Sequence, residues 1–149
     1  MAALTVSGGT VYSAGYADDS SAVHHAVYWN TSALLPNRFG SSFESRAWCL
    51  ALSGADVYVG GYITDKSGTA VAGYWKNGTW VELGNPNSST SDSQVLAIAV
   101  SGSDVYAAGW AADASGLLNQ AGYWKNGTWV ALTNTAGSGN SEATSIVVQ

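Results

Sequence analysis

The residues with catalytic or metal-binding chemistry are few, and they are not grouped for it. His24 and His25 are adjacent, and neighbouring side chains in a strand point to opposite faces, so the pair cannot bind one metal ion together. Cys49 is the single cysteine and stands where the next repeat has Ala97, which indicates a small buried position rather than a nucleophile. We therefore expect a protein that is not an enzyme and that needs no cofactor or metal.

Aspartates recur at two kinds of turn. Asp19, Asp65 and Asp113 take equivalent places in one loop of each repeat, and Asp56 and Asp104 take equivalent places in another turn. An Asp side chain at a turn accepts hydrogen bonds from nearby backbone N–H groups. A repeated cation site is the alternative, but each loop offers too few carboxylates for the six to eight oxygens that calcium prefers. We predict that these aspartates are structural.

Repeated aromatic residues are the better candidates for binding. Tyr16, Tyr62 and Trp110 end the same predicted strand in the three repeats, next to long polar connections at 37–45, 84–93 and 133–142. Aromatic rings beside polar loops can stack on sugar rings or hold a peptide. Packing of these rings between repeats is the alternative. The remaining residues that recur with the repeat are expected to be structural: Asp56, Asp104, Tyr74, Trp75, Trp80, Tyr123, Trp124 and Trp129.

The elements that position these residues follow from an internal repeat. The hexapeptide SGADVY at 53–58 recurs as SGSDVY at 101–106 and more loosely as SGGTVY at 7–12, so the copies start 46 and 48 residues apart. The nine residues GYWKNGTWV at 73–81 are repeated unchanged at 122–130. A fixed period of this length is typical of stacked supersecondary units.

Apolar runs separated by turn residues predict four strands in each copy. The first strand is predicted at 2–6, 46–52 and 94–100, and the second at 11–17, 57–63 and 105–111. The third is predicted at 23–29, 70–76 and 120–125, and the fourth at 79–83 and 128–132. The dipeptides Asn77-Gly78 and Asn126-Gly127 favour type I′ hairpin turns between the third and fourth strands.

The order of these motifs resembles the kelch type of β-propeller blade. The second strand ends in glycines and an aromatic residue (59–62, VGGY), a Tyr stands in the third strand, and a Trp stands in the fourth, at Trp80 and Trp129. The Tyr-Trp-Lys-Asn-Gly hairpin is also similar to repeats in bacterial propeller proteins. The resemblance covers nearly the whole chain and implies an all-β propeller of four-stranded antiparallel blades, three blades per chain.

The predicted boundaries are blade 1 at 1–45, blade 2 at 46–93 and blade 3 at 94–142, while 143–149 aligns with the first strand of a further blade. Propellers have four to eight blades, so three do not close a ring. A homodimer would give six blades, with the spare strand exchanged across the junction or displaced. A β-trefoil, which also has three repeats and closes as a monomer, is the alternative fold.

Two functions remain open. The first is a non-enzymatic repeat module that self-assembles into a closed propeller, as a fragment or engineered piece of a larger one, with multivalent glycan or peptide binding on its loop face. The second is a lectin-like carbohydrate-binding protein. The net charge of −5 with only five Lys and Arg disfavours nucleic acid as a partner. No apolar run approaches a membrane span, and the first residues lack a signal-peptide pattern, so we expect a soluble protein; a secreted bacterial parent is one hypothesis.

Overall fold

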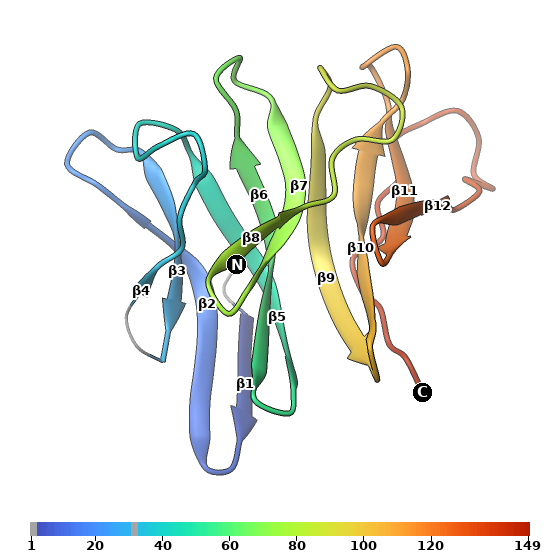
Figure 1. Ribbon diagram of the computed structural model, residues 1–149. Helices are drawn as coiled ribbons and strands as arrows, with labels where there is room; N and C mark the ends of the chain where they lie inside the picture. Colours follow the sequence, from blue (N-terminus) through green and yellow to red (C-terminus); the bar gives the residue numbers. More distant parts are fainter. Residues whose placement is uncertain (1–2, 31–32) are drawn as a thin grey trace.

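The computed structural model describes residues 3–30 and 33–149, which form three four-stranded antiparallel sheets in succession along the chain (Figure 1). Blade 1 is β1 (Ala3–Ser7), β2 (Thr10–Asp18), β3 (His24–Trp29) and β4 (Ala33–Leu34). Blade 2 is β5 (Ser45–Ser53), β6 (Asp56–Thr64), β7 (Ala70–Lys76) and β8 (Thr79–Glu82). Blade 3 is β9 (Ser93–Ser101), β10 (Asp104–Ala112), β11 (Asn119–Lys125) and β12 (Thr128–Ala131).

The chain is thus an all-β protein built of three β-propeller blades, and the β-trefoil alternative is wrong. Each sheet pairs its strands in chain order, and blade 2 lies between blade 1 and blade 3 (Figure 1). The predicted strands agree with the observed ones to within one or two residues at most ends. The exceptions are β4, which the sequence did not predict, and residue 2 of the first predicted strand, which lies outside the described residues.

The Asn-Gly hairpins form as expected. Asn77 and Gly78 have φ of 50° and 82°, and Asn126 and Gly127 have φ of 50° and 85°, so both central residues are left-handed as a type I′ turn requires. The side chain of Asn77 accepts a 2.9 Å hydrogen bond from the backbone N–H of Val57. This bond ties the hairpin to the turn between the first two strands of the same blade.

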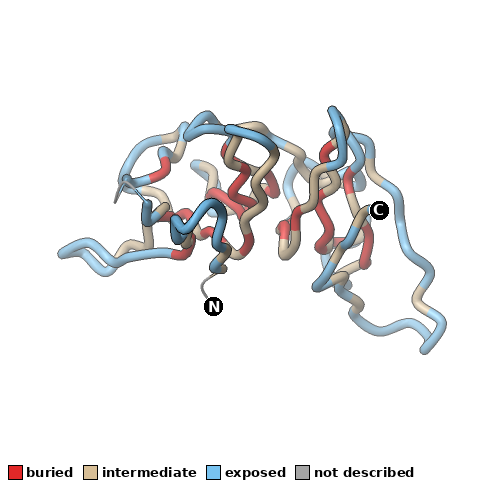
Figure 2. Tube along the Cα trace, turned by 90° about the horizontal axis from the view of Figure 1, so that it is seen from below, coloured by how far each residue is buried: buried red, intermediate tan, exposed pale blue. Residues whose placement is uncertain are grey.

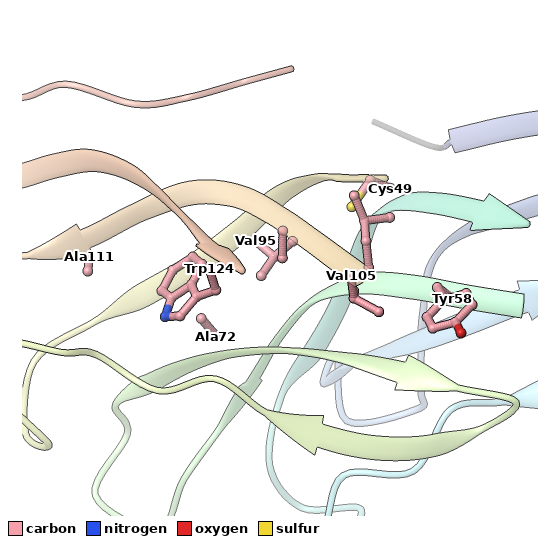
Figure 3. Close-up of a cluster of buried hydrophobic side chains, with 9 residues drawn as sticks. Cys49, Tyr58, Ala72, Val95, Val105, Ala111 and Trp124 are labelled. Carbon is pink, nitrogen blue, oxygen red and sulfur yellow. The ribbon is translucent and has the colours of Figure 1, made fainter. Parts of the chain in front are cut away.

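The cores lie between the blades rather than within one sheet. Trp75 is fully buried against blade 1, and Trp124 takes the same place between blades 2 and 3, with Val95 and Ala72 beside it (Figure 3). Each of these rings packs against the Trp of its own fourth strand, with centroids 4.6 Å apart for Trp75 and Trp80. In a view from below, the buried residues concentrate where the sheets face each other (Figure 2).

A serine at the start of the first strand docks each blade on the one before it. The backbone N–H of Ala26 donates a 3.0 Å hydrogen bond to Ser45 Oγ, and that of Ala72 donates one of 3.1 Å to Ser93 Oγ. Ser141 repeats the contact with the backbone N–H of Ala121, at 3.0 Å. The C-terminal segment (residues 141–149) therefore begins where the first strand of a fourth blade would begin, although it forms no strand ladder.

Candidate functional site

A β-bulge in the first strand of blades 2 and 3 positions the side chains of the candidate site. Ala47 pairs with Gly61 and Cys49 with Gly60, so Trp48 is the extra residue with no partner across the ladder. Leu96 is the extra residue at the same place in β9. Bulges redirect a side chain out of the regular alternation, and they recur next to functional sites.

Glycine is required opposite each bulge. A Cβ atom at Gly61 would lie 1.9 Å from the backbone oxygen of Arg46, and one at Gly109 would lie 2.0 Å from that of Gln94. No side chain fits at such distances. The glycine before the aromatic residue of the second strand therefore permits the bulge. The bulge in turn points Trp48 or Leu96 away from the regular alternation of the first strand.

Tyr16 stands at the junction of blades 1 and 2, within a cluster of aromatic and charged side chains. Its ring lies edge-on to His24 and to Trp48, with centroids 4.8 and 6.1 Å away. The Arg46 guanidinium lies over the same ring, with Cζ 4.9 Å from the centroid. Tyr16 nevertheless remains 38% exposed. We call Tyr16, His24, Arg46 and Trp48 the Tyr16 cluster.

Glu44 connects this cluster to blade 2. Its Oε1 accepts a 2.5 Å hydrogen bond from the Tyr62 hydroxyl and pairs with Arg46 Nε at 2.6 Å. Burial, followed by the nearby Glu44 carboxylate, raises the pKa of Tyr62 well above its ordinary value. Tyr62 is thus a neutral hydrogen-bond donor at physiological pH, and it holds the carboxylate that orients Arg46.

A hollow of about 380 Å³ lies beside the cluster, across the first strands of blades 2 and 3 and the C-terminal segment. Trp48 and Trp110 contribute its aromatic walls, and Gln94 and Glu142 contribute polar groups. Trp48 Nε1 donates a 3.3 Å hydrogen bond to Gln94 Oε1, which fixes both side chains at the rim. Leu96 and Thr144 complete the lining. We call this space the Trp48–Trp110 hollow.

The structure brings the three predicted binding residues together through Trp48. The Trp48 ring pairs with Tyr16 and, at 6.3 Å, with Tyr62, and it lines the hollow with Trp110. Tyr62 is buried, so the packing alternative describes its ring better than stacking on a ligand. Tyr16 and Trp110 offer accessible aromatic surface.

Four residues of the site were not predicted from the sequence: Arg46, Trp48, Gln94 and Glu142. A signal for them exists in the repeat. Arg46, Gln94 and Glu142 occupy one position of the first strand, while Trp48, Leu96 and Thr144 occupy another, and both positions change between copies in an otherwise repeated framework. Positions that vary on a repeated framework are therefore candidates for a role that differs from the shared structural one.

The repeated aspartates divide into two groups. Asp65 Oδ1 accepts hydrogen bonds from the backbone N–H groups of Ser67 and Thr69, and Asp19 and Asp113 bind their own loops in the same way. These bonds confirm the predicted turn role. For Asp56 and Asp104 the predicted partners, nearby backbone N–H groups, were wrong.

Asp56 and Asp104 bind side chains of the hairpin instead of backbone N–H groups. Asp56 accepts a 2.8 Å hydrogen bond from Asn77 Nδ2 and pairs with Lys76 Nζ at 3.0 Å, and Asn126 and Lys125 do the same for Asp104. The nearby backbone N–H of Val57 is already bound to Asn77, so it is not free for Asp56. The Asn and Lys partners lower the pKa of both carboxyls.

The candidate catalytic residues lie in separate environments. His24 Nδ1 pairs with Asp18, and His25 Nε2 lies 3.0 Å from Asp19 Oδ2, so the two imidazoles serve different partners. Cys49 is buried between blades 2 and 3, and burial raises its pKa to about 12. Within residues 3–30 and 33–149 there is no group of three or more His, Cys, Asp or Glu arranged to hold a metal ion. The same residues include no helix long and apolar enough to cross a membrane.

Comparison with known proteins gives a structural neighbour but no sequence family. No protein-family model matches the chain, and no curated protein matches it. Among solved structures, the chain is similar to a fucose lectin from Kordia zhangzhouensis, solved in complex with methyl-fucoside. The two share 14% sequence identity with a TM-score of 0.58, over 91% of this chain and 99% of the lectin chain. This likeness is one of fold.

Proposed function

We propose that this chain is a carbohydrate-binding module of lectin type and that a sugar ring binds in the Trp48–Trp110 hollow. The observation that carries the proposal is the lining of the hollow, where two indole rings stand with the amide of Gln94 and the carboxylate of Glu142. A pyranose presents apolar C–H faces that stack on aromatic rings, and hydroxyl groups that bind amides and carboxylates. The volume of about 380 Å³ falls within the usual range for small-molecule sites.

The Tyr16 cluster extends this surface. Arg46 offers guanidinium N–H donors, and Glu44 holds it in place through the 2.6 Å ion pair. A larger glycan that fills the hollow with one residue would reach Tyr16 and Arg46 with the next, because Trp48 belongs to both sites. The methyl-fucoside bound by the structural neighbour supports a sugar as the ligand class.

The experiment is a calorimetric titration with methyl-fucoside and with methyl glycosides of other common hexoses, preceded by a glycan array. We expect saturable binding to at least one glycoside. Trp110→Ala should weaken that binding about tenfold or more, because a lost aromatic contact of about 1.5 kcal/mol corresponds to this factor. Tyr12→Ala is the control, since Tyr12 stacks on Tyr28 near the other end of β2.

Two results would overturn the proposal. One is the absence of saturable binding to every glycoside at concentrations on the order of 10 mM, the weak end of specific recognition. The other is binding that Trp110→Ala and Tyr12→Ala reduce equally. Assembly of copies into a closed ring, the first function that the sequence predicts, is a separate proposal.

A further inference from the structure

Blade 1 exposes residues that the other two blades bury. By register, Leu4 occupies the position of Leu50 and Ile98, and Trp29 occupies that of Trp75 and Trp124. Trp75 and Trp124 are 0% and 1% exposed because the preceding blade covers them, whereas Trp29 is 39% and Leu4 67% exposed. Val6 and Val11 repeat the pattern. The face that blade 1 turns away from blade 2 therefore has the composition of a blade–blade interface.

Blade 3 presents the complementary face. Leu35 is 6% exposed in the core between blades 1 and 2, and Leu83 packs into the core between blades 2 and 3. Leu132 is the third member of this series, with the same backbone bond to its third strand, and it is 43% exposed. Ser141 has already formed the hydrogen bond that Ser45 and Ser93 form at the two interfaces within the chain.

We propose that a second copy of this chain occupies both faces, so that blade 1 of each copy docks on blade 3 of the other and the ring closes at six blades. The interface is continuous with the two established within the chain, since it uses the same positions of the same repeat. Two copies give six blades, inside the range of four to eight that propellers adopt, whereas three copies would give nine. The two-fold axis makes both junctions identical.

The C-terminal segment determines how the junction is built. Residues 145–149 correspond in position to β1 of the docked blade, so only one of the two stretches can lie there. β1 is held by a ladder of paired residues to β2, from Ala3 with Ala14 to Ser7 with Thr10. In the described part of the chain, the last backbone bond from the segment to blade 3 is that of the Ala143 N–H to the Gly109 oxygen, at 3.1 Å. Residues 145–149 are therefore the ones displaced.

Residues 141–144 stay in place and extend the first strand of the docked blade. In blade 2 Arg46 pairs with Tyr62, and in blade 3 Gln94 pairs with Trp110. By the same register, Glu142 of one copy comes opposite Tyr16 of the other. The Tyr16 cluster is then completed by a carboxylate from the second copy.

The experiment is the solution mass by light scattering coupled to size exclusion, without glycoside, so that its outcome is independent of sugar binding. We expect about twice the chain mass of 15.3 kDa for the unmodified protein. Leu4→Glu and Leu132→Glu should each give monomers, because each places a charge in the junction from a different side. Leu117→Glu is the matched control, since Leu117 is 81% exposed and lies in the loop between β10 and β11, outside the strands that the junction uses. All three leucines are exposed in the single chain, and circular dichroism should show unchanged β structure.

A chain that ends at Thr144 should remain dimeric, because it loses only the displaced residues. The proposal is overturned if the unmodified protein is a monomer at about 100 µM, well above the dissociation constants of stable complexes. It is equally overturned if Leu132→Glu leaves the dimer intact, since blade 1 would then pair with blade 1. Loss of the dimer on truncation at Thr144 would contradict the assignment of the displaced residues.

Discussion

The Arg46 guanidinium lies over the Tyr16 ring, 4.9 Å from its centroid, although the two residues belong to different blades. The two residues are 30 positions apart in sequence, and only the docking of blade 2 on blade 1 brings them together. Glu44 and the buried Tyr62 hydroxyl hold the guanidinium in that position. The proposed binding surface is thus a property of the junction rather than of one blade.

Replacement of Arg46 by lysine tests the role of this stack. Lysine keeps the charge but lacks the planar fork that can stack on Tyr16 and pair with Glu44 together. We expect Arg46→Lys to reduce the affinity for oligosaccharides about fivefold, roughly 1 kcal/mol, and to leave a monosaccharide in the hollow nearly unaffected. Calorimetric titration measures both. Arg38→Lys is the control, because Arg38 also pairs with a carboxylate, Glu82, and lies over a ring, Phe39, outside the Tyr16 cluster.

The glycine opposite the bulge should not tolerate a methyl group. Gly61→Ala would place Cβ 1.9 Å from the Arg46 oxygen, so either the bulge or the strand must move. We expect a loss of about 3 kcal/mol or more in the free energy of unfolding. Urea denaturation followed by tryptophan fluorescence measures it. Gly139→Ala has open space and ordinary backbone angles, and it should have little effect; equal losses in the two variants would contradict the role of the bulge.

The Asp56 carboxylate should stabilise the hairpin of blade 2 in a pH-dependent way. Asn77 and Lys76 lower its pKa in the folded state, so its contribution is present above the unfolded pKa and is lost as the pH falls through the folded value. Asp56→Asn should therefore lower Tm slightly at pH 7, and the difference should shrink as the pH falls below the unfolded-state pKa of about 3.9. Thermal melts across this range provide the measurement. A difference that is constant with pH would show that the charge is not involved.

Cys49 should be unreactive in the folded protein. With a pKa of about 12 the thiol is almost entirely protonated at pH 8, and its position between blades 2 and 3 excludes reagents. We expect an aromatic disulfide reagent to label it only after denaturation, at one thiol per chain. Rapid labelling of the native protein would indicate that blades 2 and 3 separate in solution.

Much of the fold could be predicted from the sequence because the repeat is local. The signals that predict each strand are the Asn-Gly turns, the alternating apolar residues and the recurring Trp, and each of them depends on only a few neighbouring residues. The period of the repeat then predicts the four-stranded blades. The two-residue strand Ala33–Leu34 was missed because blade 1 lacks the Trp hairpin that marks the fourth strand elsewhere. The kelch resemblance stays a prediction, since no family model matches the chain.

The site was harder to predict from the sequence because its residues come from different blades. Tyr16 and Trp110 could be found as repeated aromatics, but Trp48 leaves the regular alternation only through the bulge, which no local pattern announces. Asn37 and Asn85 illustrate the same limit. Each side-chain amide donates hydrogen bonds to three backbone oxygens, and these bonds fix the connection between two blades. In the sequence, only the equivalent positions of the two residues in successive repeats indicate this role.

The most direct test is to follow the indole N–H signals of the seven tryptophans by ¹H–¹⁵N NMR during titration with methyl glycosides, with the Trp48 and Trp110 signals assigned from Trp48→Phe and Trp110→Phe. If a sugar ring binds in the hollow, the signals of Trp48 and Trp110 shift together and saturate, while that of the buried Trp75 stays in place. A saturable shift confined to other tryptophans, or none with any glycoside, would contradict the site.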